Sequence, residues 1–161
     1  MQRRTALMLA SLVLFSCGIG LPSESFAQSD PLLGTWQLNL AKSKYSPGPP
    51  PMSQTVTIQA DGQNHKLTLA GTDATGKSTS STINRVYDGM PHPSPGNAGY
   101  DAEAATRTDP HTIIIIRTKG GKLVETDVMS VSADGKTRTF TTVGIDANGR
   151  PVNNMTVSDK Q

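Results

Sequence analysis

The sequence has little cysteine, few aromatic residues and no excess of one charge. Its 161 residues include one cysteine, Cys17, which excludes a disulfide framework and a cysteine-based zinc site. Lysine and arginine number 15 against 13 acidic residues, and both signs are scattered, so no basic footprint for nucleic acid is present. A length of 161 residues, with 35% apolar and 4% aromatic residues, suits one small domain and argues against two full ones.

Long apolar runs are also absent, apart from one uncharged run at residues 5–21, which follows two arginines. Beyond it, Ser25 and Ala27 are small residues that fit the −3 and −1 positions of a signal-peptidase cut before Gln28. The run is shorter than the roughly 20 apolar residues of a spanning helix, so no stable membrane span is expected. We therefore expect residues 1–27 to be a signal peptide.

Cys17 gives this segment a second interpretation. The residues before it, 14–16, resemble the lipobox at which bacterial lipoproteins are cut and acylated, but Phe15 fits that motif poorly. Cleavage after Ala27 is therefore preferred, and a lipid anchor on Cys17 is the minor alternative. In the preferred case residues 28–161 form one periplasmic or secreted domain, where a chain without cysteine is well suited to oxidising conditions.

Helical periodicity is missing after residue 28, whereas threonine, valine and isoleucine, which favour strands, are common. Alternating runs are separated by Gly, Asn and Asp turn signals. The expected strands cover residues 34–40, 53–60, 65–70, 77–88, 100–108, 111–119, 122–132, 137–145 and 151–158. Such a meander must protect its edges, so we expect an all-β, antiparallel up-and-down barrel of about eight to ten strands, with a β-sandwich as the alternative.

Alternation within the runs predicts which side chains are buried. Trp36, Leu38 and Leu40 share one face of the first strand. Residues 113–116 are four isoleucines, apolar on both faces, which predicts a central strand covered on both sides. In the next strand Val124, Thr126 and Val128 lie opposite Glu125 and Asp127.

The segment Pro31-Leu32-Leu33-Gly34-Thr35-Trp36 resembles the start of the lipocalin-like, or calycin, barrels, whose hallmark is Gly-x-Trp. Residues 38–49 and 132–137 are similar to small secreted bacterial proteins of unassigned function. The resemblance implies a barrel closed at the Gly34–Trp36 end, with a late Arg or Lys stacked on the tryptophan; Arg138 is the candidate. It also implies a carrier of small hydrophobic molecules. The Thr-Asp-Tyr element of classical lipocalins has no clear match, which makes the chain a looser relative.

Four side chains are the candidates for ligand contact. Arg85 shares its strand phase with Tyr87, so an inward phase would let its guanidinium bind a ligand carboxylate with two hydrogen bonds. The preferred alternative is a rim arginine whose stem covers apolar surface. Tyr87, Tyr100 and Phe140 either line a pocket or belong to the core.

Catalytic and metal motifs are not found. Three histidines lie on separate elements without metal-ligand spacing: His65, His92 and His111. Asp101 and Glu103 would share one strand face, and a solvated face is preferred over an acid–base pair. No nucleophile elbow, phosphate loop or dinucleotide fingerprint is present. We therefore expect no metal, no cofactor and no enzymatic activity.

The leading hypothesis is an exported, non-enzymatic protein that binds a small hydrophobic or amphiphilic ligand. The alternative is a structural or interaction module of the cell envelope, whose barrel is filled by its own side chains. An enzyme would require Arg85, Asp101, Glu103 or His65 to meet in one pocket. The sequence points to no oligomeric state.

Overall fold

Residues 30–161, which the computed structural model describes, form ten strands and one 3-10 helix. The strands are β1 (Gly34–Leu38), β2 (Ser53–Asp61), β3 (Asn64–Thr72), β4 (Ser78–Arg85), β5 (His92–Pro93), β6 (Ala102–Asp109), β7 (Thr112–Lys119), β8 (Lys122–Val131), β9 (Thr137–Ile145) and β10 (Pro151–Lys160). The helix η1 (Leu40–Lys42) follows β1. The predicted signal peptide, its cut between Ala27 and Gln28, and the Cys17 alternative lie outside the described residues. Within residues 30–161 no helix has the length and hydrophobicity that crossing a bilayer requires.

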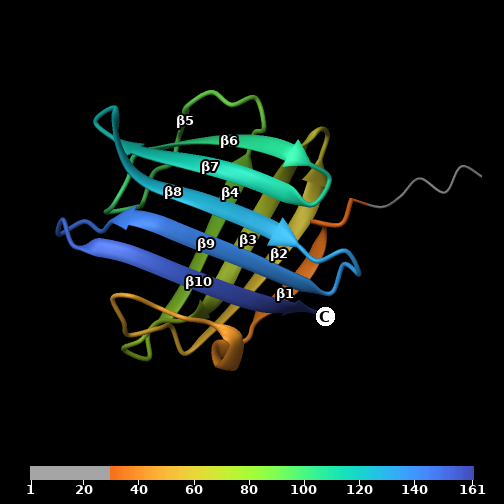
Figure 1. The fold of residues 1–161 in the computed structure, drawn as a ribbon, viewed down its shortest axis with the longest axis horizontal. Coiled ribbons are helices and arrows are strands. Elements are labelled where there is room, and N and C mark those ends of the chain that lie inside the picture. The colour runs from red at the N-terminus through yellow and green to blue at the C-terminus, as the bar shows by residue number, and fades with distance from the viewer. Residues whose placement is uncertain (1–29) are drawn as a thin grey trace, which may run out of the picture.

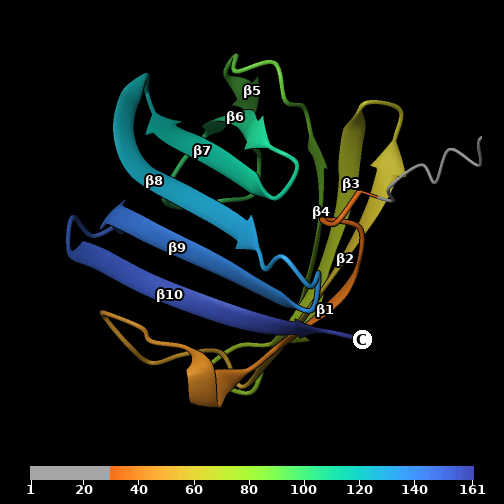
Figure 2. The same cartoon turned by 45° about the vertical axis from the view of Figure 1, so that its right-hand side comes forward.

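All ten strands belong to one antiparallel sheet in the order β4-β3-β2-β1-β10-β9-β8-β7-β6-β5. Each strand pairs with its sequence neighbour, except that β4 and β5 do not pair and β1 instead joins β10. The sheet curls so that β6–β10 run across the front in Figure 1 while β2–β4 cross behind them at a steep angle. Figure 2 shows the same curl from the side. The predicted all-β antiparallel architecture of barrel type is confirmed.

The barrel has a seam between β4 and the pair β5–β6. Only one isolated bridge, Asp88 with Thr106, and a hydrogen bond of 3.0 Å from the Gly89 amide to the Ala105 carbonyl join the two sides by backbone within the described chain. Side chains add a second link, because Nε of Arg85 donates to Oε1 of Glu103 at 3.0 Å. The seam is therefore held by an ion pair where a strand ladder is missing.

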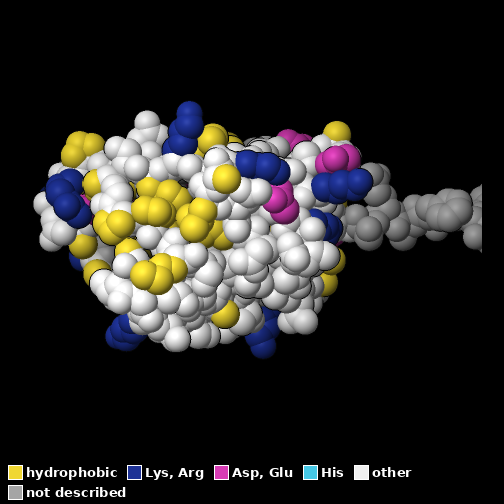
Figure 3. All heavy atoms as spheres, turned by 90° about the horizontal axis from the view of Figure 1, so that it is seen from below, with side chains coloured by type: hydrophobic (Ala, Val, Ile, Leu, Met, Phe, Trp, Pro, Cys, Tyr) yellow, Lys and Arg dark blue, Asp and Glu magenta, His cyan; other side chains and the backbone are white. Residues whose placement is uncertain are grey.

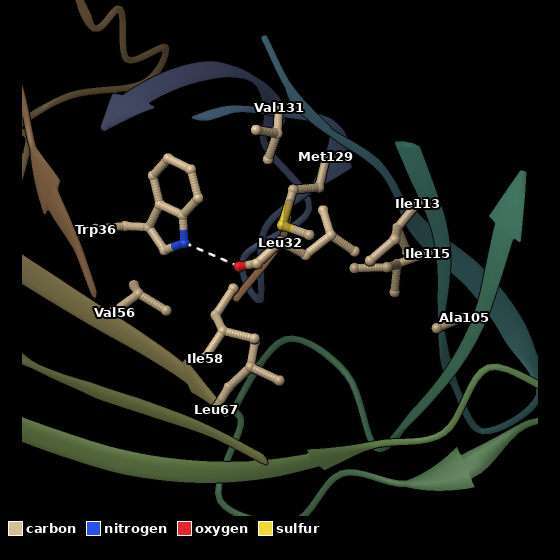
Figure 4. Packing of buried hydrophobic residues seen from close by; sticks show 10 residues of the cluster. All are labelled: Leu32, Trp36, Val56, Ile58, Leu67, Ala105, Ile113, Ile115, Met129 and Val131. Atoms are coloured by element: carbon tan, nitrogen blue, oxygen red, sulfur yellow. Dashed lines mark hydrogen bonds between the residues drawn. The ribbon is translucent and has the colours of Figure 1, made fainter. Parts of the chain in front are cut away.

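The core occupies the closed end of the barrel, where inward side chains of both halves meet (Figure 4). Its buried members are Leu32, Trp36, Val56, Ile58, Leu67, Ala105, Ile113, Ile115, Met129 and Val131. The segment before β1 folds across this end, and the indole Nε1 of Trp36 donates to the Leu32 carbonyl at 3.0 Å. The single tryptophan thus packs on the segment that plugs the barrel.

Two predictions about burial were wrong. Leu40 lies in η1 with 41% of its surface exposed, because the Asn39 side chain accepts from the Lys42 amide and caps that helix, which ends the strand at Leu38. The four isoleucines do not form a strand covered on both faces. Ile113 and Ile115 are fully buried, whereas Ile116 is 38% exposed on the outer face.

The inward face of β8 carries acidic groups. Asp127 is completely buried and the neighbouring Val128 is 40% exposed, so the carboxylate faces the interior and the valine faces outward. Glu125 shares the phase of Asp127, which pairs across the sheet with Thr142. The sequence predicted that the acidic residues and the valines lie on opposite faces of this strand. The structure shows that the face with Asp127 is the buried one.

Candidate functional site

A cavity of about 340 Å³ lies inside the barrel. Its apolar lining includes Val56, Leu67, Leu69, Ile83, Met129 and Phe140. Three arginines also line it: Arg85, Arg117 and Arg138. The cavity therefore combines an apolar wall with fixed positive groups, which suits an amphiphilic molecule.

Three of the four predicted ligand contacts line this cavity, namely Arg85, Tyr100 and Phe140. Whether they bind a ligand stays a prediction. Arg85 is 3% exposed, so the interpretation of it as a rim residue was wrong. Tyr100 packs against Arg117, whose guanidinium carbon lies 4.4 Å from the ring centre, a distance typical of a cation–π contact.

Tyr87 lies outside the cavity. It follows β4, which ends three residues earlier than expected, and it packs against the core. Its hydroxyl oxygen lies 2.7 Å from Nδ1 of His65, and burial raises the pKa of Tyr87 to about 12. The structure therefore places Tyr87 in a hydrogen-bonded packing position and not in the predicted cavity wall.

A buried ionic network surrounds the cavity. Glu103 holds Arg85, and Nη1 of Arg117 lies 3.0 Å from Oε2 of Glu125 and 3.0 Å from Oδ2 of Asp127. Arg117 is also within 3.9 Å of Glu103. Burial raises the pKa of Asp127, although the nearby charge of Arg117 and a hydrogen bond from a threonine hydroxyl counteract that rise.

Sequence reasoning missed Arg117, Glu125 and Asp127 as interior groups. It also assigned Asp101 and Glu103 to a solvated face, which is wrong for Glu103 because that residue is 6% exposed and ion-paired. Asp101 does lie at the surface, where its carboxylate accepts from the Gly120 amide at 2.8 Å. The two acidic residues are therefore not a pair.

Arg138 differs from the other two cavity arginines. It is 4% exposed, and within residues 30–161 no carboxylate lies within ion-pair distance of it. Its Nη2 donates a long hydrogen bond of 3.4 Å to the Ser158 hydroxyl, while its buried Nε has no hydrogen-bond partner in the described part of the chain. Burial, together with the charge of Arg85, lowers the pKa of Arg138 to about 10.

The closed end also has cations on the tryptophan. The guanidinium carbon of Arg138 lies 5.8 Å from the Trp36 ring centre, and Nζ of Lys160 lies 5.0 Å from it. Gly34 has a φ of +122°, and a Cβ at that position would lie 2.8 Å from Cε of Lys160. Lys160, which also donates to the Pro31 carbonyl, was not identified from the sequence, although a cation at the end of the last strand was the available signal.

A second polar cluster ties the start of the described chain to the barrel. Both oxygens of Asp30 accept from Arg107, at 2.6 and 2.7 Å, and Nε2 of His65 lies 3.0 Å from the same carboxylate. Burial lowers the pKa of His65, and the charges of Arg107 and Arg85 add to this effect, although the charge and the hydrogen bond of Asp30 act in the opposite direction. Burial raises the pKa of Asp30, but the Arg107 hydrogen bonds and charge lower it overall. The folded state therefore favours neutral His65 and ionised Asp30.

This cluster predicts that the protein loses stability on acidification. A pKa lowered below 6.5 in the folded state means that His65 contributes fully above 6.5 and less as the pH falls below it. Asp30 adds a loss of stability only below pH 3.8, the ordinary pKa of an aspartate, because its pKa is lowered in the folded state. We expect the melting temperature to fall between about pH 7 and pH 5, and the His65→Gln variant to show a smaller fall. Calorimetry across this range measures both; equal slopes in the two proteins would contradict the assignment.

One face of the molecule carries both hydrophobic and charged side chains. Figure 3 views it from below and shows hydrophobic side chains gathered in one area, with basic side chains next to acidic ones on the right of the same face. Among residues 30–161 no three His, Cys, Asp or Glu side chains are grouped so that they could hold a metal ion. His92 is paired with Asp88 at 3.0 Å. The interior cavity is therefore the candidate site.

Comparisons with known proteins bear on the fold. No protein-family model matches the chain, and no curated protein matches it significantly. Among solved structures, the zebrafish ileal bile acid-binding protein in complex with cholic acid is similar, with a TM-score of 0.51 and 12% identity. The match covers 81% of this chain and 98% of that one. At this identity the likeness shows the fold alone, and the chain shares the antiparallel β-barrel fold of that protein.

Proposed function

We propose that the protein is an exported, non-enzymatic binding protein for a small hydrophobic or amphiphilic ligand. The cavity carries this proposal: its volume of about 340 Å³ falls at the lower end of the range of small-molecule sites, roughly 300–1,000 Å³. Apolar side chains such as Leu67, Ile83 and Phe140 supply contact area, and buried arginines supply the few polar groups that orient a ligand.

The similar bile acid-binding protein supports the proposal, because its structure holds cholic acid. A barrel of this type thus accommodates a small amphiphile in at least one protein. The alternative, an envelope module with a filled barrel, is less favoured because side chains leave this interior partly empty. The cavity arginines do not form a catalytic group. Two of them are held in ion pairs with Glu103, Glu125 and Asp127, and the third lies beside Trp36.

Two hollows at the surface adjoin the cavity and are the candidate openings for a ligand. One hollow of about 450 Å³ lies along the seam and shares Ser81, Ile83 and Asn97 with the cavity lining. Another, of about 400 Å³, shares Tyr100 and Arg117 with it. The cavity therefore adjoins a surface hollow on two sides.

For the binding experiment, residues 1–161 are expressed in a Gram-negative host. The protein is then purified as the host processes it, with or without residues 1–27. Mass spectrometry under native and then denaturing conditions should release a small molecule in a fixed ratio to the chain. Titration with the neutral fluorophore N-phenyl-1-naphthylamine should show saturable binding. An apo mass together with no uptake of the fluorophore or of a lipid extract would favour the filled-barrel module.

Export has its own readout in the same preparation. We expect the protein in the periplasmic fraction or the medium, with the mass of residues 28–161. Blocking the cut by changing Ala27 to a large residue should leave the longer chain at the membrane. A mass that includes lipid on Cys17 would support the anchored alternative, and a full-length chain in the cytoplasm would contradict export.

A further inference from the structure

The three arginines that line the cavity provide an internal comparison. Arg85 is neutralised by Glu103, and Arg117 is neutralised by Glu125 and Asp127. Arg138 is as deeply buried as Arg85, but among residues 30–161 it lies beside the Trp36 ring, donates one long hydrogen bond to the Ser158 hydroxyl and has no hydrogen-bond partner for Nε. A buried cation without an anion is strongly unfavourable, so a cation that faces a cavity and has no carboxylate partner among residues 30–161 indicates a counterion from outside this part of the chain.

We propose that Arg138 is the binding site for the anionic head group of an amphiphilic ligand, a carboxylate, sulfonate or phosphate, whose apolar part fills the cavity. This inference rests on the proposed binding function and specifies the ligand class. A guanidinium presents donors in a planar fork that matches such oxyanions, and a charge-assisted pair is strongest where water is excluded.

The position of Arg138 sets the orientation of the ligand. Arg138 lies beside Trp36 at the closed end, whereas Thr142, four residues further along β9, also lines the outer hollow. Four strand residues span about 13 Å, so the charged head would lie deep and the apolar part would extend toward the opening. Met129 of β8 and Phe140 of β9 are paired across the two strands, and both lie in the cavity wall near this depth.

The test compares two fluorophores that share one ring system. N-phenyl-1-naphthylamine is neutral, and 8-anilinonaphthalene-1-sulfonate carries one sulfonate. We expect the unaltered protein to bind the sulfonate more tightly. Arg138→Met keeps the side-chain bulk but removes the charge, and we expect it to weaken sulfonate binding roughly 10- to 100-fold while changing the affinity for the neutral fluorophore little.

Lys66→Met is the matched control, because it removes one exposed positive charge of β3 without touching the cavity. It should leave both affinities unchanged. Displacement of the neutral fluorophore by dodecanoate and by dodecanol adds a comparison that needs no variant, with dodecanoate expected to displace at the lower concentration. The emission of Trp36, the single tryptophan, should shift when the anion binds and not when the alcohol binds.

The outcomes separate the two proposals. Binding of the neutral fluorophore with no preference for sulfonate or carboxylate would overturn the Arg138 site and leave the binding function intact. A preference retained by Arg138→Met would also overturn it. No binding of either fluorophore, with no release of a native ligand, would contradict the binding function itself. An unchanged or higher melting temperature for ligand-free Arg138→Met would agree with the proposal, and a large decrease would assign Arg138 to the fold instead.

Discussion

Replacing Trp36 with alanine is expected to destabilise the protein by about 3–5 kcal/mol, the usual effect of deleting a large buried aromatic side chain. The indole is fully buried among Leu32, Val56 and other core residues, and its Nε1 bonds to the Leu32 carbonyl. The variant therefore leaves a void and an unpaired carbonyl at the closed end. For a domain of this size the melting temperature should fall by roughly 10–20 °C, measured by calorimetry.

Lys160→Met is the control for this variant. It removes the cation over the outer side of the same ring, and Lys160 is exposed, so we expect a change of less than about 1 kcal/mol. Trp36→Phe should fall between the two because it restores most of the volume without the N–H donor. A small effect of Trp36→Ala would show that stability does not depend on the plug at this end.

The positions of most strands along the chain could be predicted because their signals are local. Turn pairs such as Asp61-Gly62 and Gly120-Gly121 do separate consecutive strands, and the glycines adopt positive φ. Gly34-Thr35-Trp36 indicated both the first strand and the barrel type. The short strand β5 was missed, since two residues, His92 and Pro93, carry no alternation.

The interior charges could not be predicted for a physical reason. A period of two separates the faces of a strand but does not say which one is buried, and the usual rule assigns the apolar face to the core. In β8 the rule fails because Asp127 meets Arg117 of β7, a partner that is apparent only once the strands are paired. The same holds for Glu103, because its partner Arg85 lies across the seam and is apparent only in the folded chain.

Arg138 shows the limit of the resemblance as a guide. The comparison with lipocalin-like barrels implied that it stacks on Trp36, and the structure places the two groups 5.8 Å apart. The resemblance did not indicate that Lys160 lies closer to the ring, at 5.0 Å, or that Arg138 also lines the cavity. Both facts depend on how the strands pair and curl in space. They make Arg138, a residue expected to close the barrel, a candidate ligand contact as well.

Replacing Glu103 with leucine is expected to destabilise the protein by about 3–5 kcal/mol, because it leaves the Arg85 guanidinium buried without a counterion. The Arg85–Glu103 pair is 3.0 Å long, and the two side chains are 3% and 7% exposed. It also joins β4 to β6, where the backbone contributes one isolated bridge in the described chain. Chemical denaturation should show the loss as a lower midpoint, and proteolysis should become faster at the seam.

The reverse change, Arg85→Met, should be less harmful, because Glu103 keeps the charge of Arg117 at 3.9 Å. The double variant Arg85→Met, Glu103→Leu removes both charges, and replacing a buried pair by apolar groups is often neutral or stabilising by roughly 1–4 kcal/mol. Its stability should therefore return to near that of the unaltered protein, which gives a large coupling energy in the double-mutant cycle. Additive losses would show instead that the seam is held by packing and not by this ion pair.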